Sequence, residues 1–311
     1  MIVRLPKIEP QLATLVQNPP EGDEWLHEIK YDGFRAIAYL DRGEIHLVSR
    51  NGLSFDQRFE SVRRALMSFP VDRAILDGEI CALDEHGRPR FALLQHAIQN
   101  PTESRLRYFV FDLLWDSSGD LRAHWLLSRK TRLDTHFERV DMDIVRRAEY
   151  AHGHGDAFRD ATKELELEGM VSKRADKPHR GGRSLEWQKI KFDSRQELVI
   201  VGFTPPKGSR QRFGALLLGI ADKEGDELRY AGKVGTGFDT QALESLYERM
   251  MPLRIERPAI KDPPRERGAV WLTPTLVAEI RFAEWTHDGK LRHPTFLGLR
   301  IDKRASEVRR E

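Results

Sequence analysis

Hydrophobic and polar residues alternate along much of the chain, which is the pattern of half-buried β-strands. Within residues 1–194, helical spacing of apolar residues predicts helices at residues 59–69, 126–137 and 157–167. Gly169 stands where a left-handed residue would end the third helix. We interpret the proline-punctuated residues 1–22 as an arm or a short helix packed on this part. Alternating or continuous apolar runs predict strands at residues 34–40, 45–48, 74–83, 108–115, 143–150, 168–173 and 187–191.

The pattern changes beyond residue 194, where the predicted strands are shorter and a single helix is expected, at residues 240–250. The proline- and charge-rich residues 252–267 read as an irregular insert. Several short strands with one helix over this length suit a five-stranded OB barrel. We therefore expect an α+β protein in which antiparallel sheets with flanking helices (residues 1–194) precede an OB-fold domain (residues 195–311). The predicted strands of the second domain lie at residues 197–203, 214–220, 228–234 and 277–284.

The amino-acid composition and charge exclude several classes of protein. The 311 residues are 40% hydrophobic, enough for real cores, and 32% charged. No apolar run approaches membrane-span length and the N-terminus has no signal-peptide pattern, so we expect a cytoplasmic protein without membrane contact. The single cysteine, Cys81, excludes an internal disulfide and a cysteine-cluster metal site. Net charge is only +2, but residues 172–195 and 291–311 are strongly basic. These runs favour an anionic substrate, although solvated surface faces look similar.

Candidate chemistry centres on residues 28–35 (EIKYDGFR). Most lysines are solvated surface residues, but Lys30 lies among apolar neighbours in a strand-rich region. Desolvation and nearby cations would lower its pKa, and a neutral amine can attack an electrophilic phosphorus. The Asp32-Gly33 turn would let Arg35 reach back toward a phosphate or a ribose.

Further charged and aromatic residues lie inside predicted strands, where each also has a plain structural explanation. Acids in an apolar strand, such as Asp77 and Glu79, are costly unless they are paired or ligate something, although Asp-Gly also forms turns. Phe111 would by default be a core residue. Lys189 and Lys191 share one strand face, as in any amphipathic strand.

These segments resemble the motifs of the covalent nucleotidyltransferases, which comprise ATP-dependent DNA ligases, RNA ligases and mRNA capping enzymes. The similarity is closest to the ligase domain of bacterial end-joining ligases of the ligase D class, through residues 9–15, 201–204 and 294–300, and it spans nearly the whole chain. The first domain would then be an adenylation (nucleotidyltransferase) domain. The chain has no room for polymerase or phosphoesterase modules, so we expect a stand-alone relative or an excised domain. The matched motifs stand in family order at residues 28–35 (motif I, KxDGxR), 49–52 (Ia), 77–79 (III), 111–112 (IIIa), 168–173 (IV), 187–191 (V) and 300–303 (VI).

The resemblance implies a role for each matched residue. Lys30 would become joined to AMP taken from ATP, and Arg50 would contact the nucleic-acid backbone. Asp77 and Glu168 would hold a divalent metal, Mg²⁺ or Mn²⁺. The remaining residues would bind the nucleotide: Glu28 the adenine amino group, Arg35 a phosphate or the ribose, Glu79 the ribose, Phe111 and Val171 the purine faces, Lys189 and Lys191 the nucleotide phosphate, and Arg300 and Lys303 the β- and γ-phosphates.

The resemblance also implies the function. We expect an ATP-dependent DNA ligase that seals 3′-hydroxyl/5′-phosphate breaks through a lysyl-AMP and a DNA-adenylate, in bacterial double-strand-break repair by non-homologous end joining. Its partners would be nicked or broken duplex DNA, a Ku-like end-binding protein and a separate repair polymerase, and the enzyme would act as a monomer at the nucleoid. Two alternatives stay open: a capping guanylyltransferase, which shares motif I and the OB domain, and an OB-type nucleic-acid binder with a defunct site.

Overall fold

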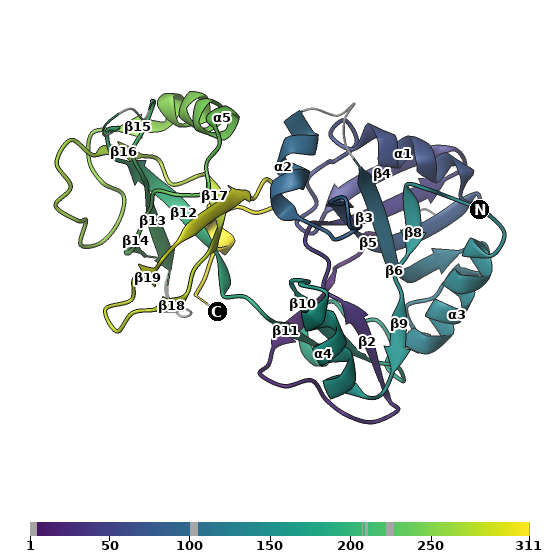
Figure 1. Ribbon diagram of the computed structural model, residues 1–311. Helices are drawn as coiled ribbons and strands as arrows, with labels where there is room; N and C mark the ends of the chain where they lie inside the picture. Colours follow the sequence, from purple (N-terminus) through teal and green to yellow (C-terminus); the bar gives the residue numbers. More distant parts are fainter. Residues whose placement is uncertain (1–4, 100–104, 207, 209–210, 222–226, 311) are drawn as a thin grey trace. The chain divides into compact units, whose positions relative to one another are not determined.

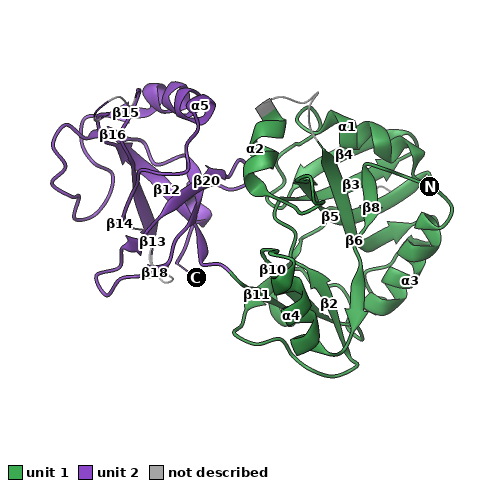
Figure 2. Cartoon of the chain, in the orientation of Figure 1, with its two compact units in different colours: residues 1–192 green, residues 193–311 purple. Residues whose placement is uncertain are grey.

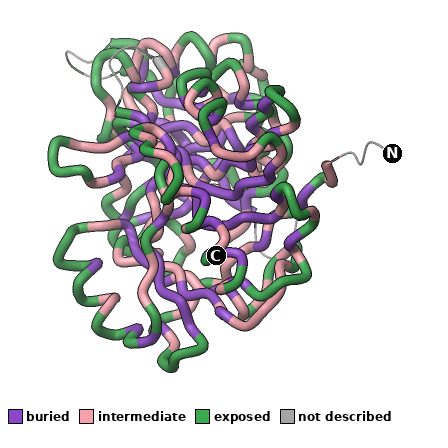
Figure 3. Tube along the Cα trace, turned by 90° about the vertical axis from the view of Figure 1, so that its right-hand side faces the viewer, coloured by how far each residue is buried: buried purple, intermediate pink, exposed green. Residues whose placement is uncertain are grey.

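The computed structural model describes residues 5–99, 105–206, 208, 211–221 and 227–310. The chain forms two compact units, residues 1–192 and residues 193–311 (Figure 2). Buried stretches follow the strands, while the connecting loops are exposed (Figure 3). Within the described residues, no helix is long and apolar enough to span a membrane.

The first unit contains two largely antiparallel sheets (Figure 1). One has the order β4-β3-β5-β6-β7, with β8 added parallel to β6, and the other has the order β1-β11-β10-β2-β9, with β1 parallel to β11. The strands are β1 (Gln11–Leu15), β2 (Trp25–Ile29), β3 (Phe34–Asp41), β4 (Glu44–Ser49), β5 (Arg73–Ala82), β6 (Leu106–Asp116), β7 (Gly119–Asp120), β8 (Val145–Arg147), β9 (Tyr150–His152), β10 (Gly169–Arg174) and β11 (Gly182–Lys191).

Helices cover these sheets. The helix α2 packs on β5, α3 on β6 and β8, and α4 on β10 and β2. A cluster of phenylalanine rings, with centroids 5.1 to 6.4 Å apart, lies beneath α1 and α2 and supports β3. The helices are α1 (Glu60–Ala65, continued by a 3₁₀ turn at Leu66–Ser68), α2 (Phe91–Gln99), α3 (Leu126–Phe137) and α4 (Gly155–Glu164).

The second unit is an antiparallel sheet of order β14-β13-β12-β16-β15, in which β17 pairs with β12 and β20 with β17, around its own apolar core. Helix α5 (Thr240–Met250) begins where the Asp239 carboxylate accepts the backbone N–H of Ala242, at 2.7 Å. The strands are β12 (Arg195–Phe203), β13 (Leu216–Ala221), β14 (Leu228–Val234), β15 (Arg254–Ile255), β16 (Val270–Leu272), β17 (Val277–Arg281), β18 (Glu284–Trp285), β19 (Leu291–Arg292) and β20 (Thr295–Leu299).

Most predicted elements are present, and α3 and α5 have the predicted bounds. Residues 11–15, however, form a strand and not an arm or a short helix, because they pair in parallel with β11; residues 1–4 lie outside the described part. The prediction for Gly169 was also wrong. The left-handed residue after α4 is Glu166, with φ of 54°, whereas Gly169 opens β10. A glycine is needed there because a Cβ would lie 2.1 Å from the Ile190 carbonyl oxygen.

Candidate active site

Lys30 follows the last residue of β2, and its backbone N–H donates to the Gly169 carbonyl at 2.9 Å. The antiparallel pairing of β2 with β10 brings the two motifs together across 138 residues of sequence. As a result, the Lys30 Nζ donates to Glu168 Oε1 at 2.5 Å. The Lys30 side chain keeps 22% of its surface exposed, so an incoming substrate can reach the amine.

The protonation state of Lys30 differs from the sequence-based prediction. Burial alone would lower the pKa of this ammonium, but the charge of Glu168 and its hydrogen bond outweigh burial and raise the pKa above its ordinary value. The expectation of a lowered pKa was therefore wrong for this state of the protein. The lysine is charged and paired, so a proton must leave before the amine can attack phosphorus.

The Lys30 side chain lines a cavity of about 140 Å³. The cavity is formed by residues from both sheets of the first unit, and most of the predicted nucleotide-binding residues line it. These are Glu28, Lys30, Arg35, Glu79, Phe111, Val171 and Lys189, joined by Ala13, Ile29, Tyr31, Lys173 and Trp187. The structure thus brings together five of the motif segments, I, III, IIIa, IV and V, which the sequence analysis had connected only by resemblance.

Arg35 and Asp77 form a bidentate ion pair, with Nε–Oδ1 at 2.9 Å and Nη2–Oδ2 at 2.6 Å. The third nitrogen, Nη1, donates to the Gln11 carbonyl at 2.6 Å, so Arg35 also holds β1 against β3. Asp77 is fully buried and is not among the residues that line the cavity. Both of its oxygens accept hydrogen bonds from Arg35, so Asp77 positions that guanidinium. That Asp77 also ligates a metal stays a prediction.

Phe111 is 8% exposed, and its ring meets Trp187 edge-on with centroids 6.0 Å apart. The Lys173 Nζ lies 4.1 Å from the Phe111 centroid and 4.2 Å from that of Trp187. Phe111 is consequently both part of the core and part of the cavity wall, and the two explanations that the sequence left open are compatible.

Two lysines that the sequence analysis did not select are paired with Glu28. Lys130 Nζ and Lys173 Nζ each lie 2.7 Å from a different oxygen of its carboxylate. A signal for Lys130 was present, because it falls between Leu126 and Leu133 on the buried face of α3. A charged residue at such a position indicates a buried partner.

The other predicted residues lie apart from the cavity lining. Lys191 shares a strand face with Lys189 but pairs with Gly169, beyond the residues that line the cavity. Arg50 follows β4 at a half-buried turn. Arg300 and Lys303 belong to the second unit.

In that unit Arg300 pairs with Asp302 at 2.7 Å and with Glu279 at 3.2 Å. Lys303 donates to Glu197. Both motif VI cations are thus held by acids of their own unit, and these side chains must exchange partners before they can bind a phosphate.

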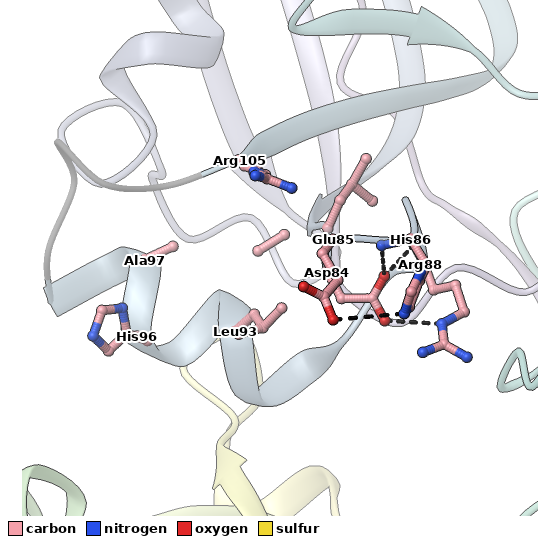
Figure 4. A pocket seen from close by; sticks show the side chains of 10 residues that line it. Asp84, Glu85, His86, Arg88, Leu93, His96, Ala97 and Arg105 are labelled. Carbon is pink, nitrogen blue, oxygen red and sulfur yellow. Dashed lines mark hydrogen bonds and ion pairs between the residues drawn. The ribbon is translucent and has the colours of Figure 1, made fainter.

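A second, larger cavity of about 390 Å³ lies in the first unit between α2 and the hairpin of residues 84–88 (Figure 4). Asp84 and Arg88 on its wall form an ion pair at 2.9 Å, and the side chains of His86, His96 and Arg105 also line it. None of the predicted site residues lines it. Size does not identify the candidate site here, since among the described residues Lys30 and most of the predicted nucleotide-binding residues line the smaller cavity and none lines the larger one.

Comparison with known proteins agrees with this arrangement. Residues 7–191 match the ATP dependent DNA ligase domain, and residues 209–303 match the ATP dependent DNA ligase C terminal region. The chain belongs to the ATP-dependent DNA ligase family. As in other members, a nucleotidyltransferase domain precedes an OB-fold domain, which confirms the predicted α+β architecture.

Curated relatives of this ligase include the multifunctional non-homologous end joining protein LigD of Pseudomonas aeruginosa, 42% identical over 306 residues. LigD of Mycolicibacterium smegmatis is 34% identical over 294 residues. The matches cover 97% and 93% of this chain but only 36% and 37% of those proteins. The chain therefore spans about a third of the length of the relatives it matches.

Solved structures of ligase D proteins also match this chain. A structure described as mycobacterial DNA ligase D complexed with ATP and MES superimposes with a TM-score of 0.73 at 31% identity. The ligase domain of LigD from M. tuberculosis gives a TM-score of 0.54 at 32% identity. Each match covers 97% of this chain and 98% of the other.

Proposed function

We propose that this ligase seals breaks in duplex DNA by three transfers of an adenylyl or phosphoryl group, with Lys30 as nucleophile. The observation that carries the proposal is the position of Lys30, which is accessible in a cavity together with the predicted purine-, ribose- and phosphate-binding residues. Family membership makes ATP the source of the adenylyl group.

In the first step, the Lys30 Nζ forms a bond to the α-phosphorus of ATP while the bond to pyrophosphate breaks. Glu168, at 2.5 Å, is the nearest acceptor for the proton that the ammonium must lose. In the second step, an oxygen of the 5′-phosphate takes the adenylyl group from lysine. In the third, the 3′-hydroxyl attacks that phosphate and AMP leaves. In-line positioning and charge neutralisation dominate such transfers.

The cavity residues divide the nucleotide between them. Phe111 and Val171 would enclose the purine, Glu28 would accept from its amino group, and Arg35 and Glu79 would bind the ribose. Lys189 would neutralise the α-phosphate from the cavity wall, and Lys191, on the same face of β11 but beyond the lining, would add positive charge. Ligand pockets usually measure about 300–1,000 Å³, so this cavity of about 140 Å³ would have to widen to admit a whole nucleotide.

A divalent metal fits this site only together with the nucleotide. Among the described residues no group of three or more His, Cys, Asp or Glu side chains is arranged to hold an ion. Mg²⁺ is usually bound by one or two carboxylates plus substrate phosphates, and Glu168 can supply such a carboxylate. When bound, Mg²⁺ or Mn²⁺ would neutralise charge on the phosphates and compete with Lys30 for Glu168.

Because the relatives are named as non-homologous end joining proteins, we extend the proposal to double-strand-break repair by that route. We propose residues 1–194 as the adenylation domain and residues 195–311 as the OB-fold domain of a monomeric enzyme, with Arg50 on the DNA backbone. A Ku-like end-binding protein and a separate repair polymerase would be its partners. Since its substrate is the chromosome, such an enzyme would act at the nucleoid in the bacterial cytoplasm.

The test is sealing of a nicked duplex that carries a labelled 5′-phosphate, in the presence of Mg²⁺ or Mn²⁺. We expect a longer labelled strand with ATP and none without it. Sealing with GTP, or transfer of GMP to an RNA end, would favour the guanylyltransferase alternative. Shifted mobility of the DNA without sealing would favour the non-enzymatic binder.

The raised pKa of Lys30 predicts how the first step depends on pH. Below that pKa the neutral amine increases about tenfold for each pH unit, so the single-turnover rate of enzyme–AMP formation should rise from about pH 6 to about pH 9. Sealing of a nick that already carries the 5′-adenylate does not use the amine and should vary much less. Equal pH profiles for the two reactions would show that deprotonation of Lys30 does not limit the first step.

Replacing Phe111 separates its two roles. Phe111→Ala removes both ring and volume, and truncation of a buried phenylalanine costs about 3–5 kcal/mol of stability. Phe111→Leu keeps most of the apolar volume but cannot stack on a purine. We expect Phe111→Leu to melt near the wild-type temperature while its KM for ATP rises about tenfold. An early-melting Phe111→Leu protein with an unchanged KM would assign this ring to the core alone.

A further inference from the structure

Three buried charged residues form a network at the cavity that Lys30 lines, and the motif roles account for only one of them. Glu28 lines the cavity and is 2% exposed. Lys130 and Lys173, each 2.7 Å from its carboxylate, are 1% and 2% exposed. Buried ion pairs seldom stabilise a fold more than apolar residues of equal volume do. This trio, which we call the Glu28 clamp, is therefore a candidate for a functional role.

Both lysines are themselves fixed in place. Lys130 extends from α3, donates to the Phe111 carbonyl at 2.9 Å and lies 4.7 Å from the centroid of the Tyr150 ring. Lys173 extends from β10 between Phe111 and Trp187. The clamp thus ties Glu28 to the elements that form the proposed base-binding wall, and Glu28 has little freedom to turn away from the cavity.

The two lysines are not equivalent. Burial, reinforced by the charge of Lys130, lowers the pKa of Lys173 to about 8, although Glu28 acts in the opposite direction. In mildly alkaline solution Lys173 therefore loses part of its charge. Lys130, which belongs to no motif, is the second amine in contact with the Glu28 carboxylate.

Glu28 retains capacity to bind a ligand. Its Oε1 is paired electrostatically with Lys130 but accepts no well-aligned hydrogen bond from the described residues. An ionised carboxylate can only accept hydrogen bonds, whereas a protonated one can also donate. At position 6 of the ring, a 6-amino purine carries an amino group that donates a hydrogen bond. A 6-oxo purine carries a carbonyl oxygen there, which accepts one. An ionised Glu28 therefore pairs with the first and repels the second.

Resting on the proposed adenylation function, we propose that Lys130 and Lys173 are positioning residues that hold the Glu28 carboxylate in place as a hydrogen-bond acceptor, so that the cavity selects 6-amino over 6-oxo purine nucleotides. The effect on substrate passes through Glu28, because neither lysine needs to touch the base. Sites built around a substrate hydrogen bond reject analogues that lack it far more strongly than apolar pockets reject a change of size.

The experiment compares enzyme–nucleotide adduct formation from ATP and from ITP, whose base is 6-oxo but lacks the 2-amino group of guanine. The proteins are wild type, Lys130→Met, Glu28→Gln and the double variant, each checked by thermal melting. Lys163→Met, at an exposed position of α4, is the matched control. Should Lys130→Met not fold, Lys173→Met takes its place.

We expect wild type and Lys163→Met to prefer ATP by on the order of 100-fold or more. Lys130→Met should reduce this ratio at least tenfold, Glu28→Gln should do the same, and the double variant should add nothing further, as expected for residues that act as one unit. Equal loss of both rates in Lys130→Met at an unchanged ATP/ITP ratio overturns the proposal, as does an additive double variant. No adduct in wild type overturns the proposed function itself, and this inference with it.

Discussion

Lys30→Ala should form no enzyme–AMP adduct, and its ATP-dependent nick sealing should fall to background. No other lysine of the cavity lies where the Lys30 amine lies. Lys173 in particular is held by a hydrogen bond to Glu28 and by contacts with the rings of Phe111 and Trp187. Lys30→Arg should fail equally, because a guanidinium stays protonated and is a poor nucleophile. The readouts are transfer of label from α-labelled ATP to the protein and sealing on a gel.

The same variants should still seal a nick that already carries the 5′-adenylate, because Lys30 is the nucleophile only in the first step. Lys163→Ala, an exposed lysine of α4, is the matched control and should behave as wild type. An adduct that persists in Lys30→Ala would assign the nucleophile to another residue.

Replacing Arg300 or Lys303, the motif VI cations, should slow formation of the enzyme–AMP adduct but not the final sealing step. The β- and γ-phosphates exist only in the first step, so groups that bind them accelerate that step alone. We expect Lys303→Met to slow enzyme–AMP formation by about 10²–10³-fold, the usual effect of removing one charge-stabilising donor. Sealing of a pre-adenylated nick should stay near wild type.

Arg300→Ala should act in the same direction but is a less clean variant. It leaves Asp302 and Glu279 without their cation, and breaking a buried pair costs about 3–5 kcal/mol. Thermal melting must therefore accompany its kinetics. Arg304→Ala, at the exposed neighbouring arginine, controls for the loss of positive charge. Equal loss of both steps in Lys303→Met would mean that this segment holds DNA or the fold rather than the triphosphate.

Local patterns were sufficient for much of the fold. The alternation in β4 and the buried run of β5 each specify a strand on their own. The strand β1 escaped prediction because it is short, is flanked by prolines, and exists only by pairing with the distant β11. The helix α2, which was not predicted, has a helical pattern in which Phe91, Leu94 and Ala97 are buried on one face.

The chemistry of the site depended more on tertiary contacts. The motif residues could be listed from the sequence, but the charge state of Lys30 depends on Glu168, which lies 138 residues away. In the same way, Asp77 is paired with Arg35 because the antiparallel pairing of β3 with β5 brings the two residues close together. Spacing within one strand cannot show which of several acids a cation will meet across the sheet.

Mapping the adenylyl group tests the central claim most directly. The ligase is incubated with ATP and a divalent metal, digested, and its peptides are analysed by mass spectrometry under conditions that preserve the acid-labile phosphoramidate. We predict one modified peptide, carrying a single adenylyl group on Lys30, and its loss when pyrophosphate or nicked DNA is added. A stable adduct on any other residue, or nick sealing by a protein that never carries AMP, would contradict the account.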